Sequence, residues 1–326
     1  MRFLIANNTK IPAVGYGGTE RVIWWLGKEF VRLGHEVTYL VAPGSSCPFA
    51  RVLPYDPAVP MPRQIPPDID FAHFHFQIVT PVAVPYLITH HGNDAIAREY
   101  DINTVFVSLN HAQRHGARAF VHNGLDPEEY GPVDLHRPRR HLLFLGYARR
   151  PEKNLKACAA IARGCGLPLA IVGGRKKFGN AWFRLMGSEY MGYLGGKEKN
   201  LVLQNSTALL FPVRWHEPFG LAVIEALYFG CPVFGTAYGS LPELITPEVG
   251  LLSNSRAKLT NAVQTLLPGW DRRKCHEYAR AHFTCKQMAQ NYLAMYGQVL
   301  EGKTLNPKKP RAQETFSKDK LLPFFE

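Results

Sequence analysis

Long apolar segments are missing from this sequence of 326 residues. No hydrophobic run reaches the roughly 18 residues that a membrane-spanning helix needs, so we expect no transmembrane segment. The short apolar stretch near the N-terminus, Phe3–Ala6, is too short for the core of a secretory signal and is typical of a first β-strand. These absences favour a cytoplasmic protein.

Paired cysteines are missing as well. The six cysteines are scattered along the chain, and no two of them form a C-x-x-C motif. This arrangement predicts neither disulfide bonds nor a structural zinc site. We therefore expect reduced thiols.

Acidic residues are scarce in the second part of the chain. Residues 1–135 contain 10 Lys/Arg and 13 Asp/Glu, a net charge of −3, whereas residues 136–326 contain 28 and 13, a net charge of +15. Such an excess favours an anionic partner, which could be a nucleotide, a nucleic acid or an acidic membrane surface. A basic surface without a specific partner is the alternative, and charge alone leaves the choice open.

Short apolar runs alternate with helical patterns along the chain. The runs typical of strands are Arg2–Ala6, Val37–Val41, Ile69–Phe74, Tyr86–Thr89, Thr104–Ser108, Ala119–Val121, His141–Leu145, Pro168–Val172, Tyr190–Leu194, Thr207–Val213 and Pro232–Gly235. Between the first two, Val22, Leu26 and Phe30 recur every four residues, which predicts a helix over Gly18–Gly34. The alternation predicts an α/β protein of two doubly wound, Rossmann-like domains with parallel sheets.

Composition also suggests the domain boundaries. Prolines and glycines interrupt residues 130–140, so we expect domains over residues 1–135 and 136–302, with the last helix packing back toward the first domain. Residues 303–326 are basic, show little periodicity and are expected to be a mobile tail. The tail ends in Leu321, Leu322, Phe324 and Phe325, so it could hold the protein peripherally on an anionic membrane.

The segment that carries most chemistry is residues 211–225, which read FPVRWHEPFGLAVIE. It begins in a predicted strand, and Gly220 begins a predicted helix whose first N–H groups and dipole would suit a phosphate. Ligands of open α/β sheets bind beyond the carboxyl ends of the strands, which is where Glu217 lies. Glu217 and Glu225 are eight residues apart and could contact two parts of one extended ligand. Either glutamate alone could equally be a helix cap or a solvated side chain.

The whole string E-P-F-G-L-x-V-I-E-A-L, followed by G-C-P-V, resembles the donor-site motif of the retaining glycosyltransferases of family four, which have the GT-B fold. Further segments are similar to that family in the same order along residues 2–300. They are the glycine loop Gly15–Glu20, the T-x-H-G segment Thr89–Asn93, the turn His122–Asp126, the strand and basic loop Phe144–Lys153, the segment Gly239–Glu243, and a late helix with Tyr292 and Tyr296. Glu20 stands where a dinucleotide fingerprint needs glycine, which disfavours nicotinamide binding.

The resemblance implies transfer of a hexose from a UDP- or GDP-linked donor to an acceptor that the sequence does not identify, with retention of the anomeric configuration. It implies catalytic roles for His91 and Glu217, with His91 facing the donor sugar and Glu217 binding its hydroxyls. The implied donor-binding residues are Gly17, Gly18, Arg149, Arg150, Lys153, Phe219, Gly220, Leu221 and Glu225, of which Glu225 would bind the ribose. The family commonly has arginine where this chain has Tyr147, so either Arg149 or Arg150 would supply that cation.

The predicted donor domain, residues 136–302, contains no D-x-D tripeptide, the sequence cue for a metal bridging a diphosphate, and the one at Asp68–Asp70 lies outside the segments that resemble the family. We therefore expect neither a metal nor another cofactor. Three alternatives remain: another enzyme with the same fold, such as a sugar phosphorylase or a nucleotide-sugar epimerase, a basic nucleic-acid-binding protein, and a catalytically inactive relative that only binds its ligand. The second is disfavoured because the basic residues are dispersed and no recognition motif is present.

Overall fold

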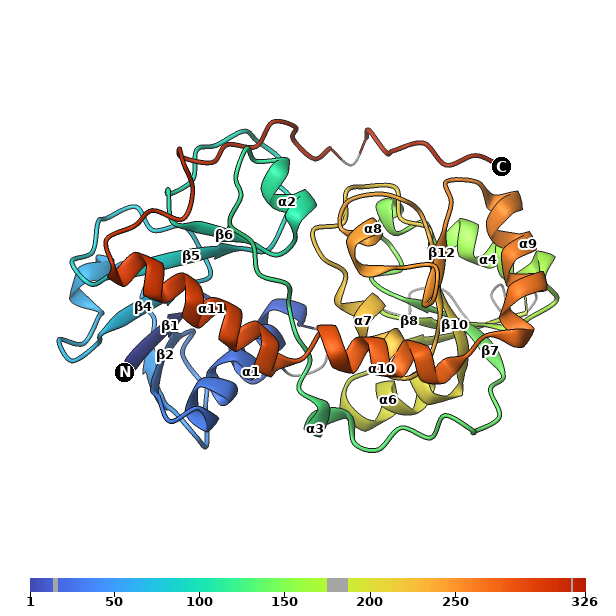
Figure 1. Ribbon diagram of the computed structural model, residues 1–326, viewed down its shortest axis with the longest axis horizontal. Coiled ribbons are helices and arrows are strands. Elements are labelled where there is room, and N and C mark those ends of the chain that lie inside the picture. Colours follow the sequence, from blue (N-terminus) through green and yellow to red (C-terminus); the bar gives the residue numbers. More distant parts are fainter. Residues whose placement is uncertain (14–16, 175–186, 318) are drawn as a thin grey trace. The chain divides into compact units, whose positions relative to one another are not determined.

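The structure, a computed structural model, describes residues 1–13, 17–174, 187–317 and 319–326. The chain forms two compact units (Figure 1). Unit 1 contains residues 1–126 and 283–315, and unit 2 contains residues 127–282 and 316–326. The first division therefore falls after Asp126, before the stretch where the sequence suggested it, and each unit includes a piece of the C-terminal part of the chain.

The described residues of unit 1 form a parallel sheet with the strand order β3-β2-β1-β4-β5-β6. Its strands are β1 (Arg2–Ala6), β2 (Glu36–Val41), β3 (Arg51–Pro54), β4 (Phe71–Phe74), β5 (Tyr86–His90) and β6 (Thr104–Phe106). Its helices are α1 (Gly18–Arg32), α2 (Leu109–Gln113), α11 (Cys285–Leu300) and a 3₁₀ turn, η1 (Met61–Arg63). The central strands are apolar almost throughout because both faces of a parallel sheet are covered.

Two long helices complete the core of unit 1. Helix α1 buries Val22, Leu26 and Phe30, the residues whose spacing predicted it. Helix α11 contributes Tyr296, whose ring stacks on Phe71 at 4.2 Å between centroids and lies 5.7 Å from the ring of Phe30. These aromatic contacts explain why the last long helix belongs to the N-terminal unit.

Unit 2 has a second parallel sheet, with the order β12-β11-β10-β7-β8-β9. Its strands are β7 (His141–Leu145), β8 (Leu169–Val172), β9 (Ser188–Gly192), β10 (Ser206–Phe211), β11 (Val233–Gly235) and β12 (Gly250–Leu252). Its described helices are α3 (Pro127–Tyr130), α4 (Leu155–Gly164), α6 (Gly196–Asn205), α7 (Leu221–Tyr228), α8 (Leu241–Leu244), α9 (Arg256–Leu266) and α10 (Arg272–His282), with 3₁₀ turns η2 (Pro151–Lys153) and η3 (Leu267–Gly269). Two six-stranded parallel sheets confirm the predicted doubly wound α/β class.

The strand orders place a topological switch point in each unit. In unit 1 it lies between β1 and β4, and in unit 2 it lies between β7 and β10. In open α/β sheets, ligands bind in the crevice outside the carboxyl ends of the strands at such a point. The segments that follow β7 and β10 therefore lie where a ligand of unit 2 is expected.

Three local predictions differ from the structure. The expected strand Ala119–Val121 is reduced to a single bridge between Phe106 and Phe120. Strand β3 lies between the predicted strands Val37–Val41 and Ile69–Phe74, where no strand was predicted. Strand β12 was not predicted because it is only three residues long. It is recognised as a strand by its pairing with β11 in the structure.

The C-terminal segment is packed against both units, which contrasts with the mobile tail expected from its composition. In unit 1, the side chain of Asn306 is fully buried and binds the backbone at four points, Arg118, Ala119, Ile102 and Thr104. In unit 2, the backbone of Leu322 is hydrogen-bonded to Arg214, and Phe324 packs against the apolar core. Insertion of Phe324 into a membrane would require this packing to be given up.

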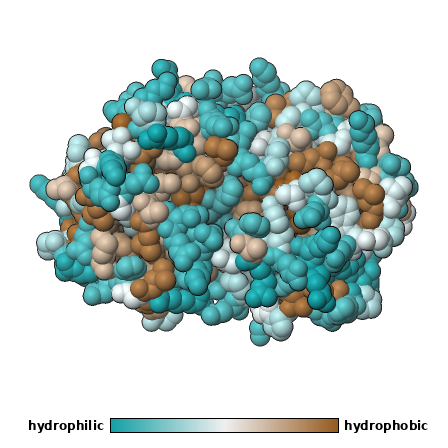
Figure 2. Space-filling view, viewed as in Figure 1, coloured by the Kyte–Doolittle hydropathy of each residue, from teal (hydrophilic) through white to brown (hydrophobic). Residues whose placement is uncertain are grey.

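No helix among the described residues is long and apolar enough to cross a membrane. Figure 2 shows hydrophilic residues over most of the face in view, with smaller hydrophobic patches between them. Scattered apolar residues are ordinary on a protein surface and indicate no partner by themselves.

Candidate functional site

The most conspicuous polar cluster of unit 2 follows β10 and surrounds the start of α7. Gly220 precedes the helix with φ +97°, a left-handed conformation that glycine adopts without steric cost. The first N–H groups of a helix have no acceptor within it, and the helix dipole places partial positive charge there. The loop therefore directs the start of α7 toward the carboxyl edge of the sheet, a position suited to a phosphate.

Glu217 is held in this loop by two side chains. Its Oε2 atom accepts hydrogen bonds from Lys153 Nζ at 2.6 Å and from Trp215 Nε1 at 2.8 Å. The ammonium of Lys153 also lies 4.6 Å from the centroid of the Trp215 ring, where cation–π attraction holds it. Since Glu217 is buried, these contacts keep its charge compensated and its position fixed.

A second loop braces the first. The backbone N–H of Ser240 donates to the carbonyl of Glu217 at 3.0 Å, and its hydroxyl donates to the carbonyl of Phe219 at 2.5 Å. Gly239 has φ +65°, and a Cβ there would lie 2.3 Å from the backbone nitrogen and oxygen of Glu217. The resemblance to family four included Gly239 and Ser240, and the structure shows why these small residues matter: they allow close contact with the Glu217 loop.

Glu225 lies on α7 and is buried with different partners. Its Oε1 accepts a hydrogen bond from the hydroxyl of Tyr130 at 2.7 Å and forms an ion pair with Lys199 of α6. Lys199 also lies 5.5 Å from the centroid of the Tyr130 ring. Glu225 was identified from the sequence, whereas Tyr130 and Lys199 were missed because nothing in their own segments distinguishes them. Trp215 lies inside the segment 211–225 but was given no role there.

The basic loop after β7 is tied to the end of β10. The N–H of Arg214 donates to the carbonyl of Glu152 at 2.7 Å, and the side-chain amide of Asn154 donates to the carbonyl of Pro212 at 2.9 Å. These bonds bring Lys153 of η2 to Glu217. Arg149 and Arg150 remain exposed, and Arg150 lies 3.7 Å from the carboxylate of Glu152.

The other candidate residues lie in unit 1. His91 follows β5, is half-buried, and its Nε2 lies 2.8 Å from Nδ1 of His75 with the two rings stacked. Burial, with a smaller effect of the neighbouring His90, lowers the pKa of His91 to about 3, so the imidazole is neutral near pH 7. Gly17 and Gly18 lie at the start of α1, whereas Gly15 and Tyr16 of the same loop lie outside the described residues.

Comparison with known proteins finds a family match within unit 2. Residues 142–282 match the family "Glycosyl transferases group 1". The curated relatives include an uncharacterised 41.2 kDa protein in the cps region of Klebsiella pneumoniae, 32% identical over 115 residues, which are 33% of this chain and 31% of that protein. Another is a GDP-mannose-dependent α-(1-6)-phosphatidylinositol dimannoside mannosyltransferase of Mycobacterium tuberculosis, 29% identical over 112 residues, or 33% of this chain and 29% of the relative. The alignments thus span about a third of these relatives.

Solved structures are similar over nearly the whole chain. AviGT4, a glycosyltransferase involved in avilamycin A biosynthesis, superposes with a TM-score of 0.79 over 93% of this chain and 99% of its own, at 24% identity. Sucrose-phosphate synthase from Thermosynechococcus elongatus gives 0.71 over 93% and 100% at 18% identity. Anabaena Alr3699/HepE, solved with UDP and glucose, gives 0.65 over 90% and 99% at 14% identity. These likenesses confirm the GT-B fold that the resemblance implied.

Proposed function

We propose that the chain, whose residues 142–282 match the family "Glycosyl transferases group 1", is a retaining glycosyltransferase that uses a nucleotide-diphosphate sugar as donor. The donor carries a hexose on UDP or GDP, and the acceptor is unidentified. One observation carries this proposal: Glu217 and Glu225 are both buried beside the first turns of α7, at the carboxyl end of β10, and each is held by a lysine.

In this proposal the two glutamates have different tasks. Glu225, fixed by Tyr130 and Lys199, accepts hydrogen bonds from the ribose hydroxyls. Glu217, fixed by Lys153 and Trp215, accepts them from the hydroxyls of the transferred sugar. Pre-arranged carboxylates bind sugar hydroxyls without reorganisation at the moment of reaction, which is the condition for strong transition-state stabilisation.

The diphosphate requires positive groups rather than carboxylates. The first N–H groups of α7, from Leu221 onward, supply two or more donors beside Gly220, with Phe219 fixing the loop before them. Lys153 donates one of its N–H groups to Glu217 and can direct another to a phosphate oxygen. Exposed Arg149 and Arg150 are the further candidates for that contact. As the bond between sugar and phosphate breaks, these groups stabilise the charge that accumulates on the leaving group.

The test is to replace each carboxylate by its amide. Glu225→Gln is expected to weaken binding of UDP or GDP with a smaller effect on turnover, and Glu217→Gln to lower kcat by on the order of 10²–10³ with little change in nucleotide affinity. Nucleotide affinity is measured by calorimetric titration and transfer with labelled nucleotide sugars, with and without added magnesium, since a donor-site metal is not expected. If both variants keep the nucleotide affinity and kcat of the parent, the proposed roles of the two glutamates are wrong.

The same assay separates the remaining candidates. Conversion of the nucleotide sugar into its epimer would indicate an epimerase. Phosphate-dependent formation of a sugar phosphate would indicate a phosphorylase. The role of His91 near the reacting centre is a proposal from the resemblance, and His91→Asn tests it as a loss of kcat. The peripheral contact with anionic membranes also stays a prediction from charge.

A further inference from the structure

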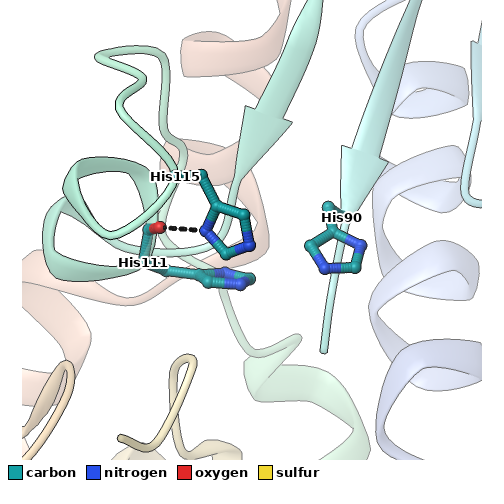
Figure 3. Close-up of side chains that lie close together, drawn as sticks. All are labelled: His90, His111 and His115. Carbon is teal, nitrogen blue, oxygen red and sulfur yellow. Dashed lines mark hydrogen bonds between the residues drawn. The ribbon is translucent and has the colours of Figure 1, made fainter. Parts of the chain in front are cut away.

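Unit 1 contains a cluster of three histidines that the proposed transfer reaction does not use. His90 is the last residue of β5, His111 belongs to α2, and His115 follows that helix. Figure 3 shows the three rings turned toward one another, and one ring nitrogen from each lies within 4.8 Å of the others. His111 and His115 are almost completely buried, at 1% and 3% exposure.

The hydrogen bonds of two rings fix their protonation. His111 Nε2 lies 2.9 Å from the carbonyl oxygen of Gly92, and His115 Nδ1 lies 2.7 Å from the carbonyl oxygen of His111. A carbonyl only accepts, so these nitrogens donate, and in the neutral tautomer that results the opposite nitrogens, His111 Nδ1 and His115 Nε2, carry lone pairs. Both of these lone-pair nitrogens are buried and have no hydrogen-bond partner.

A carboxylate completes the group. Asp94 is also buried, and its Oδ2 lies 3.2 Å from His90 Nε2 and 3.7 Å from His115 Nε2 without forming a hydrogen bond of good geometry. Its Oδ1 faces Arg98 Nε at 3.3 Å. Buried polar atoms normally have partners, so the unpartnered atoms of Asp94, His111 and His115 require an explanation.

We propose that His90, Asp94, His111 and His115 bind a zinc ion. Three imidazole nitrogens and one carboxylate oxygen form a donor set that zinc favours, in tetrahedral geometry. Metal-binding histidines usually donate their second N–H to a carbonyl or carboxylate, which is the arrangement of His111 and His115. Tetrahedral zinc at about 2.0–2.1 Å from each ligand holds the ligand atoms about 3.3 Å apart. The three histidine nitrogens, which are spread over as much as 4.8 Å, would therefore have to approach one another by up to about 1.5 Å when the ion binds.

Such an ion is structural, since four protein ligands leave no open position for a substrate. It joins the loop after β5 to α2, and this region also receives the C-terminal segment. The N–H of Arg311 donates to the carbonyl of His115 at 2.8 Å, and the N–H of Tyr100 donates to the carbonyl of Pro310 at 2.8 Å. Zinc is thus expected to stabilise unit 1 and the attached tail. No structural zinc was predicted from the sequence because only the spacing of the cysteines was considered, and these are all free.

The experiment uses the full chain purified with zinc present and then desalted. We expect about one zinc ion per chain by mass spectrometry, and visible absorption bands of tetrahedral cobalt after exchange with Co²⁺. A chelator is expected to lower Tm, and added zinc to restore it, because the folded state binds the ion and the unfolded state does not. A zinc content near zero, together with a Tm unchanged by chelator or zinc, would overturn the proposal and leave the contact between His90 and Asp94 as a purely structural one.

Matched variants identify the ligands. His115→Gln and Asp94→Asn are expected to weaken zinc binding by more than about 100-fold and to abolish the dependence of Tm on zinc. His136→Gln, at an exposed histidine of unit 2, is the control and is expected to keep both. Equal zinc content in all three variants would assign the metal to another site and refute this one. The site uses none of the proposed donor-binding residues, so its failure would leave the glycosyltransferase proposal unaffected.

Discussion

At the scale of residues, each acidic group of the donor site has a basic partner that the motif itself does not contain. Glu225 is paired with Lys199, and Glu217 with Lys153. A buried carboxylate without such a partner would be protonated or displaced. The partners therefore decide whether the motif can act as a pair of anionic acceptors.

Replacement of Lys199 tests this dependence. Lys199→Met leaves Glu225 buried with its charge uncompensated, so we expect unit 2 to lose about 3–5 kcal/mol of stability and nucleotide binding to weaken. Urea unfolding and calorimetric titration with UDP and GDP measure the two effects. Lys197→Met, at an exposed residue of the same helix, is the control. If Lys199→Met behaves like Lys197→Met, the pair does not support the site.

A second residue-scale prediction concerns acid stability. His73 is fully buried between Tyr296 and Thr89, and burial lowers its pKa well below 6.5. Below about pH 6.5 the unfolded chain therefore binds a proton at His73 that the folded chain does not bind. The free energy of unfolding of unit 1 consequently falls as the pH drops below that value. The same holds for His75.

The free energy of unfolding, measured from about pH 7 to about pH 5, is expected to decline less steeply in His73→Gln than in the parent. The variant is less stable at neutral pH, so the slope rather than the absolute value is the readout. His282→Gln, at an exposed histidine of α10, should keep the parental slope. An unchanged slope in His73→Gln would show that another group controls acid unfolding.

At the scale of elements, the loop that contains Glu217 and the loop that contains Gly239 and Ser240 are packed against each other beside the start of α7. Gly239 and Gly131 both have left-handed backbones, with φ +65° and +68°. A Cβ at 239 would collide with the backbone of Glu217 at 2.3 Å, whereas a Cβ at 131 would meet nothing within 4 Å. Alanine is therefore expected to cost about 1 kcal/mol at either position because of the left-handed backbone. Only at position 239 does its Cβ also collide with a neighbouring loop.

We expect Gly131→Ala to cost about 1 kcal/mol of stability with normal transfer activity. Gly239→Ala should cost more and should lower kcat at least 10-fold, because displacement of the Glu217 loop by about 1 Å disturbs the carboxylate. Thermal unfolding and the transfer assay distinguish the two. Similar kinetics in both variants would mean that the contact with Gly239 does not position Glu217.

At the scale of the whole molecule, the C-terminal segment is part of the fold of each unit. Asn306 satisfies four backbone groups of unit 1 with one side chain, and each such hydrogen bond contributes about 1 kcal/mol. Asn306→Ala is therefore expected to destabilise unit 1 by about 2–4 kcal/mol, measured by urea unfolding. Thr304→Ala, at an exposed neighbour, serves as the control. If Asn306→Ala loses no more stability than Thr304→Ala, the Asn306 side chain does not hold the C-terminal segment on unit 1.

The sequence by itself determined the class of fold and the motif at the centre of the site. Apolar runs that are buried on both faces have no ambiguity of pattern, so most strands could be predicted, and the string from Phe211 to Glu225 marked the start of α7. Tertiary structure decided what pattern cannot encode. Lys199 and Tyr130 are ordinary in their own segments and become partners of Glu225 only when α3, α6 and α7 are packed together. The tail was predicted to be mobile because contacts such as those of the Asn306 side chain are made with the backbone of residues 188 and 204 positions earlier, and no local periodicity indicates such bonds.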